Sequence, residues 1–183
     1  MGMDNNKRIK EMIDRLGRIN AADEWGEDIN PTQQTALSYL ARANRFSRSP
    51  SQVAEFMTAT RGTVSQTLKV LARKGLITEF RSQLDKRSIS YSITEKGKAL
   101  LQKTTAIEIA VSLLNDDETS LLLGGLETLM RNALKQRGFK AFGICETCRH
   151  HLHKSHGLVC DLLGEPLSPK DAKKICHEYS EVA

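Results

Sequence analysis

The stretch TVSQTLKVLARKGLI, which spans residues 63–77, is the most informative part of the sequence for the fold. Three of its apolar residues recur at helical spacing and form one stripe for a core, namely Val64, Leu68 and Leu71. Gly75 follows as a stop signal, because glycine readily adopts the left-handed conformation that ends many helices. The other face of this helix is polar and basic. The stretch therefore predicts a helix with one side for packing and one side for a partner.

The next stretch, LDKRSISYSITEKGKALL at residues 84–101, changes the periodicity from helix to strand. Apolar residues and serines alternate over residues 88–93, which predicts a half-buried strand. The segment LITEF at residues 76–80 is the candidate partner strand, and the polar segment 81–88 between them is predicted as a hairpin tip. A two-stranded hairpin is marginally stable by itself, so it must pack against helices.

Helices are predicted on both sides of this region. Asn30 and Ser49 are each followed by a proline at the first helical position and by a glutamine that completes a capping box. Apolar periodicity predicts further helices from Asn5 to about Arg18, from Thr94 to about Leu114, and from an acidic cap to about Gly138. The sequence thus predicts a mainly α chain with a small β-hairpin wing, in the order of a winged helix-turn-helix.

Positive charge is concentrated around the predicted helix and hairpin. Residues 61–103 contain ten basic and three acidic residues, a net charge of +7 against +5 for the whole chain. Such a surface can neutralise phosphates, and Gln, Arg and Lys can also hydrogen-bond to base edges. The outward face of the helix and the hairpin tip supply the candidate DNA contacts: Arg61, Thr63, Ser65, Gln66, Lys69, Arg73, Lys86 and Arg87.

These stretches resemble the MarR family of bacterial transcription regulators. The resemblance covers roughly residues 5–138 and lies in the KGL turn, in the Asp-x-Arg element of the wing and in the ITEKG segment at residues 93–97. It implies a homodimer with interlaced first and last helices, bound to a palindromic operator in double-stranded DNA, most often as a repressor. It also implies that Arg87 enters the minor groove and that Asp85 holds it in place. A small-molecule effector would be compatible with such a regulator.

Every cysteine and histidine of the chain lies after residue 144. They are Cys145, Cys148, Cys160, Cys176, His150, His151, His153, His156 and His177. The first two cysteines have the Cys-x2-Cys spacing that lets two sulfurs chelate one ion from a tight turn, and four thiolates suit zinc or an iron–sulfur cluster. A short capped helix at residues 168–176 is expected to deliver the last cysteine from its C-terminal end. We therefore expect a DNA-binding and dimerisation domain at residues 1–140 and a small metal-stapled module at residues 141–183.

The choice of metal stays open between two alternatives. Zinc is the first expectation, because it is the commoner metal in four-cysteine sites. An iron–sulfur cluster is the alternative, because only one Cys-x2-Cys pair is present and the other two cysteines are widely spaced. A histidine could replace one sulfur on zinc, although His151, His153 and His156 read as a solvated basic patch. The spacing is equally compatible with a structural site and with a sensor of metal or redox state.

Other classes of function are less consistent with the sequence. No Ser–His–acid set, phosphate loop or paired-carboxylate pattern argues for an enzyme. The remaining alternatives are a protein-interaction module and a thiol redox protein with little specific DNA binding. No apolar run approaches the roughly 18 residues of a membrane span, and the charged N-terminal segment is unlike a signal peptide. We therefore expect a cytoplasmic protein, whose cysteines would be thiols or metal ligands and not disulfides.

Overall fold

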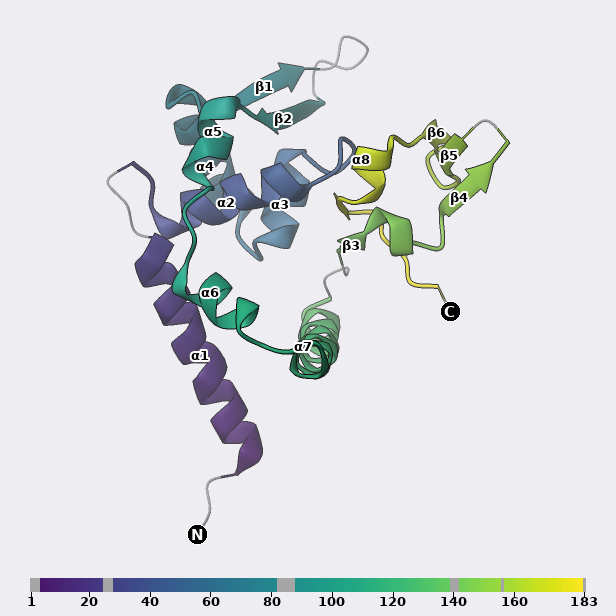
Figure 1. The fold of residues 1–183 in the computed structure, drawn as a ribbon. Coiled ribbons are helices and arrows are strands. Elements are labelled where there is room, and N and C mark those ends of the chain that lie inside the picture. The colour runs from purple at the N-terminus through teal and green to yellow at the C-terminus, as the bar shows by residue number, and fades with distance from the viewer. Residues whose placement is uncertain (1–3, 25–27, 82–87, 139–141, 156, 183) are drawn as a thin grey trace.

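The computed structural model describes residues 4–24, 28–81, 88–138, 142–155 and 157–182. Its first part contains seven helices and one hairpin in the described residues: α1 (Asn5–Glu24), α2 (Pro31–Arg42), α3 (Pro50–Phe56), α4 (Arg61–Arg73), β1 (Ile77–Arg81), β2 (Ile89–Ile93), α5 (Glu95–Leu100), α6 (Ala106–Ser112) and α7 (Asp116–Gln136). Figure 1 shows α2, α3 and α4 packed next to the hairpin, with α1 and α7 on the side away from it. None of the described helices is long and apolar enough to cross a bilayer.

Local cap chemistry defines where the central helices begin. Asn30 and Gln33 form a complete capping box at the start of α2, and Ser49 and Gln52 form another at the start of α3, as predicted. The helices then bury their apolar stripes against one another, and the most deeply buried side chains include Tyr39, Leu40, Val53, Val64, Leu68 and Leu71. Gly75 has a φ of 70° and ends the turn after α4, as the sequence predicts.

The wing is an antiparallel hairpin of two strands. β1 pairs with β2 in a register that places Ile77 opposite Ile93 and Arg81 opposite Ile89. The hairpin packs on the helices through Tyr91, which is buried. Arg48 joins it to the helices, because its guanidinium donates to the Ala43 carbonyl at 3.0 Å and to the Ser92 hydroxyl at 3.0 Å. The sequence therefore predicts both the strands and their dependence on the helices.

The first helix after the wing is pressed against the backbone at Gly97. A Cβ atom at this position would overlap the Leu76 carbonyl oxygen and lie 2.8 Å from Ile93 Cγ1. The Leu76 oxygen cannot retreat freely, because it accepts hydrogen bonds from the Thr94 amide at 3.0 Å and the Thr94 hydroxyl at 3.1 Å. Only glycine fits at this contact.

Replacing Gly97 with alanine should therefore destabilise the winged helix by about 3 kcal/mol, the upper end of ordinary overpacking costs. The free energy of unfolding from urea titration would measure the loss. Gly62→Ala is the matched control, since a Cβ at this helical position would meet only Thr60 Oγ1 at 3.9 Å. Its stability should be unchanged or slightly higher, because alanine favours helices over glycine. Equal stability of the two variants would contradict the assigned contact.

One predicted helix is divided in the structure. The segment from Thr94 to Leu114 was expected to be continuous, but α5 ends at Leu100 and α6 begins at Ala106. The division has a local cause. Thr105 caps a new helix start, with its amide donating to Glu108 at 2.8 Å, and the Ala106 amide donates to Asp23 Oδ2 at 2.7 Å. The capping box therefore starts a new helix, and the hydrogen bond from Ala106 to Asp23 joins this helix to the end of α1.

The long outer helices expose apolar side chains. Within the described residues α6 and α7 contain no buried residue. The exposed apolar residues of the outer helices are Ile9, Met12, Ile13, Leu16 and Ile19 on α1, and Leu121, Leu122, Leu123, Leu126, Leu129 and Met130 on α7. Patches of this size on a single chain usually mark a surface that another molecule covers.

The C-terminal part is built from short elements. They are β3 (Gly143–Ile144), the 3-10 turn η1 (Cys145–Thr147), β4 (His151–Lys154), β5 (Gly157–Cys160), β6 (Glu165–Pro166), α8 (Pro169–Ala172) and β7 (Ile175–Cys176). β3 pairs with β7, and β4, β5 and β6 form a second small sheet. Ser168 caps α8 as predicted, but this helix ends at Ala172, so Cys176 lies on a strand and not at the end of the helix. The Lys174 amide donates to the Asp171 carbonyl, three residues earlier, so it does not continue the α-helical hydrogen-bond pattern.

Candidate nucleic-acid interface and cysteine cluster

Helix α4 presents the face that the sequence predicts. It begins at the N-cap Thr60 and buries Val64, Thr67, Leu68 and Leu71. Five of the six candidate DNA contacts on it are exposed: Arg61, Thr63, Gln66, Lys69 and Arg73. Ser65 is half-buried at the edge of this face. The arrangement gives α4 a basic and amide-bearing outer surface; contact of these residues with DNA stays a prediction.

The wing is described up to Arg81 on one strand and from Ser88 on the other. Asp85, Lys86 and Arg87, which the sequence places at the hairpin tip, lie outside the described residues. Within the described part, Arg81 is exposed, and Glu79 pairs with it at 2.9 Å. Glu79 also accepts a hydrogen bond from the Tyr91 hydroxyl at 2.9 Å. Arg81 is a cation on this wing that sequence reasoning did not single out.

Three segments bring the four cysteines into one buried cluster. Cys145 begins the η1 turn and Cys148 follows it, Cys160 ends β5 and Cys176 ends β7. Their exposed fractions are 4%, 7%, 6% and 4%, and all four are free thiols. The Cys145 amide donates to the Lys174 carbonyl at 3.0 Å, which fixes the turn beside β7. Few apolar residues are buried in this part within the described residues: Leu167 packs with three of these cysteines, and Val159, Ala172 and Ile175 are buried elsewhere in it.

The thiols are close enough to influence one another. Burial, together with the neighbouring Cys176, Cys160 and Cys148, raises the pKa of Cys145 to about 12. Burial also raises the pKa of Cys176, whereas the Asn44 side chain, the Glu178 backbone and the Ser47 side chain lower it. The Ser180 amide donates to Cys148 Sγ at 3.4 Å. For Cys145 and Cys176 the net shift of the pKa is upward, which favours the neutral thiol.

In this structure the four thiols are not arranged around a common metal position. Among the described residues no three or more His, Cys, Asp or Glu side chains are in position to hold a metal ion. A shared ion would therefore require the cysteine side chains to rotate toward it. His153 is exposed as predicted, but His151 is half-buried, and its buried Nε2 has no hydrogen-bond partner in the part of the chain that the structure describes. His156 lies outside the described residues.

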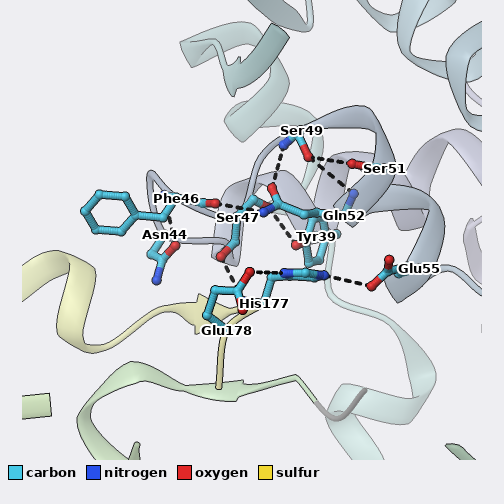
Figure 2. Close-up of polar contacts among 10 residues, drawn as sticks. All are labelled: Tyr39, Asn44, Phe46, Ser47, Ser49, Ser51, Gln52, Glu55, His177 and Glu178. Atoms are coloured by element: carbon cyan, nitrogen blue, oxygen red, sulfur yellow. Dashed lines mark hydrogen bonds and ion pairs between the residues drawn. The ribbon is translucent and has the colours of Figure 1, made fainter. Parts of the chain in front are cut away.

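The residues next to Cys176 contact the connection between α2 and α3, and Figure 2 shows His177 beside this connection. Ala43 and Ile175 form a parallel β-bridge, and the Asn44 amide donates to the Ile175 carbonyl at 2.9 Å. The His177 amide donates to the Ser47 hydroxyl at 2.8 Å. His177 Nε2 lies 2.7 Å from Glu55 Oε2 on α3. Sequence reasoning missed all of these contacts, because no local pattern links residues that are so far apart in the chain.

Part of the chain is similar to a known protein family. Residues 27–88 match the model of the MarR family. The matched segment contains α2, α3, α4 and β1. A comparison with curated protein sequences gave no match.

Solved structures share the fold. FabT from Streptococcus pneumoniae, crystallised in complex with DNA, is 22% identical, with a TM-score of 0.58 over 73% of this chain and 99% of that chain. A MarR transcriptional regulator from Methanosarcina mazei Go1 is 24% identical, with a TM-score of 0.58 over 70% and 98% of the two chains. The MepR–DNA complex of S. aureus is 21% identical, with a TM-score of 0.56 over 72% and 99%. The chain therefore has the winged-helix fold of MarR regulators and contains more residues than these relatives.

Proposed function

We propose that this protein is a homodimeric, sequence-specific DNA-binding transcription regulator that acts as a repressor. The observation that carries the proposal is the exposed basic face of α4 opposite its buried stripe, beside a hairpin with its own exposed cation. In a helix-turn-helix the second helix enters the major groove, and the residues on its outer face reach bases and phosphates. Two of the solved relatives were crystallised with DNA, which supports the same use of this fold here. A dimer seated on a promoter blocks it by occupancy alone.

The proposed dimer is formed by the outer helices. Residues such as Leu16 on α1 and Leu126 on α7 are 48% and 47% exposed in the single chain, and they lie on apolar stripes. Pairing with a second copy would remove both stripes from water. Two-fold symmetry of the protein then requires two equivalent half-sites, so the proposed operator is palindromic.

Lys69→Ala should weaken DNA binding and lower the salt slope of the affinity by about one, because one phosphate contact is lost. The slope comes from fluorescence anisotropy titrations at several salt concentrations, with a duplex selected from a random-sequence pool. Lys173→Ala is the matched control, since Lys173 is an exposed lysine on the C-terminal part. Identical slopes for wild type and both variants would remove α4 from the interface.

We further propose that Cys145, Cys148, Cys160 and Cys176 hold one metal centre, with zinc as the first choice and an iron–sulfur cluster as the alternative. Four buried free thiols from three segments support this proposal. So does the small apolar core around them, because a segment with little core gains folding free energy from a metal. The Ser180 amide on Cys148 is the kind of N–H to sulfur contact that steadies a bound thiolate.

Metal analysis of protein purified without air tests this proposal directly. One zinc per chain and a colourless solution support zinc, whereas a brown solution with iron and sulfide supports the cluster. Protein that contains neither and binds neither on reconstitution would point to the thiol redox alternative. The metal centre and the DNA-binding proposal fail independently, because the salt-dependent titration above does not use the cysteines.

A further inference from the structure

The last cysteine is held between two contacts to the same turn of the DNA-binding part. Ile175 accepts the Asn44 amide at 2.9 Å on one side of Cys176. His177 donates its amide to the Ser47 hydroxyl at 2.8 Å on the other side. Cys176 therefore cannot move without pulling on residues 44–47, which connect α2 to α3.

Two side chains of this turn, Asn44 and Ser47, are fully buried where the turn bonds to the residues on either side of Cys176. Both lower the pKa of the Cys176 thiol, although burial keeps its net shift upward. Asn44 Oδ1 is occupied, since it accepts the Phe46 amide at 3.0 Å, whereas Asn44 Nδ2 has no hydrogen-bond partner of good geometry among the described residues. An unpaired buried amide is unfavourable, because it has lost water and gained no acceptor. A metal-bound thiolate at Cys176 would offer that amide the acceptor it lacks.

The residues of this turn also accept hydrogen bonds from side chains on α2 and α3 (Figure 2). The Tyr39 hydroxyl donates to the Ser47 carbonyl at 2.6 Å, and Gln52 Nε2 on α3 donates to the Phe46 carbonyl at 2.9 Å. The His177 imidazole contacts Glu55 on α3 at 2.7 Å. Helix α3 packs directly against α4. A change in the position of Cys176 would therefore be transmitted through residues 44–47 and α3 to the proposed recognition face of α4.

We propose that the Asn44–Ser47 turn is the outer shell of the four-cysteine site, and that through it metal in this site raises DNA affinity. The inference rests on both parts of the proposed function. A second route exists through α7, where Arg131 Nη2 lies 2.8 Å from Glu181 Oε1. That pair is about half exposed on both sides, and exposed ion pairs contribute little. The buried turn is the stronger link.

The expected coupling is the ratio of DNA dissociation constants for metal-free and zinc-loaded full-length protein. Couplings between two sites typically correspond to about 5–150-fold. We expect a ratio in this range for wild type, a ratio close to one for Ser47→Ala, and an unchanged ratio for Glu181→Gln. The Ser47 variant removes the acceptor of the His177 amide, and it leaves every cysteine in place. The DNA probe is the duplex selected from a random pool, and Zn²⁺ is the metal.

Three outcomes would overturn the inference alone. If wild type binds both zinc and DNA but the ratio of its DNA dissociation constants is one, the metal does not affect DNA affinity. A ratio below one would mean that the metal lowers DNA affinity, which also contradicts the inference. A Ser47→Ala protein with the wild-type ratio shows that the link runs elsewhere. Absence of zinc binding, or absence of DNA binding, would instead overturn the proposed function, and the inference with it.

A second measurement does not use DNA and shows whether the Ser47 variant is folded. Hydrogen exchange of residues 43–57 should be slower in zinc-loaded than in metal-free wild type, because the Asn44 amide is protected by the Ile175 carbonyl. Ser47→Ala should exchange normally in α4 and lose the zinc-dependent protection at residues 43–57. Protection confined to residues 143–181 in wild type would mean that the metal does not reach the helix-turn-helix.

Discussion

Replacing Cys148 with serine is expected to abolish zinc binding and to unfold the C-terminal part. Structural zinc in small domains contributes about 10–16 kcal/mol, and the core here contains little else. Loss of an outer-shell partner lowers metal affinity about 10–100-fold, and loss of a ligand should lower the zinc affinity by more than this. Competition titration with a chromophoric chelator would measure the affinity, and hydrogen exchange over residues 143–181 would measure the unfolding.

Thr147→Ala is the control for this change. Thr147 is exposed in the same turn, and its hydroxyl donates to the Ile144 carbonyl at 3.0 Å. Its zinc content should match that of wild type. Full zinc content and unchanged exchange in the Cys148 variant would exclude a centre shared by all four cysteines.

Placing aspartate at Leu126 should convert the protein to a monomer and weaken operator binding by about 10²–10⁴-fold. The loss has two steps: a charge on the apolar stripe of α7 opposes pairing, and a monomer loses the bivalent hold on two half-sites. Sedimentation equilibrium would give the mass, and anisotropy would give the affinity for the selected duplex.

Thr128→Asp provides the matched control on the same helix. At about 100° per residue it lies on the side of α7 opposite Leu126. We expect it to remain dimeric and to bind DNA as wild type does. A Leu126→Asp protein of dimeric mass would place the interface on other elements.

Local chemistry explains why much of the fold could be predicted from the sequence. The starts of α2 and α3 follow from an N-cap, a proline and a glutamine within four residues, and the structure contains both capping boxes. The alternation around Tyr91 likewise places β2. The break before α6 carried the same kind of signal at Thr105 and Glu108, but the apolar periodicity across it suggested one continuous helix. Competing local signals, rather than missing ones, caused that error.

The candidate site could be predicted only in part. The exposed face of α4 follows from helical period, and the four cysteines stand out because of their residue type. Asn44 and Ser47 have no such signal, since they read as ordinary polar residues between two helices. Their position against Cys176 depends on how the C-terminal part docks. Likewise, the strand position of Cys176 depends on pairing between β3 and β7, which spacing does not reveal.

The contact between His177 and Ser47 joins positions that are 130 residues apart. The elements α2 to β2, by comparison, are complete within residues 31–93. Contacts between distant positions pay more loop-closure entropy and form later than local ones. During translation the winged helix can assemble while the segment with Cys176 is still inside the ribosome. On the proposals above, the winged helix of a newly made chain would fold before the segment that responds to metal docks against it.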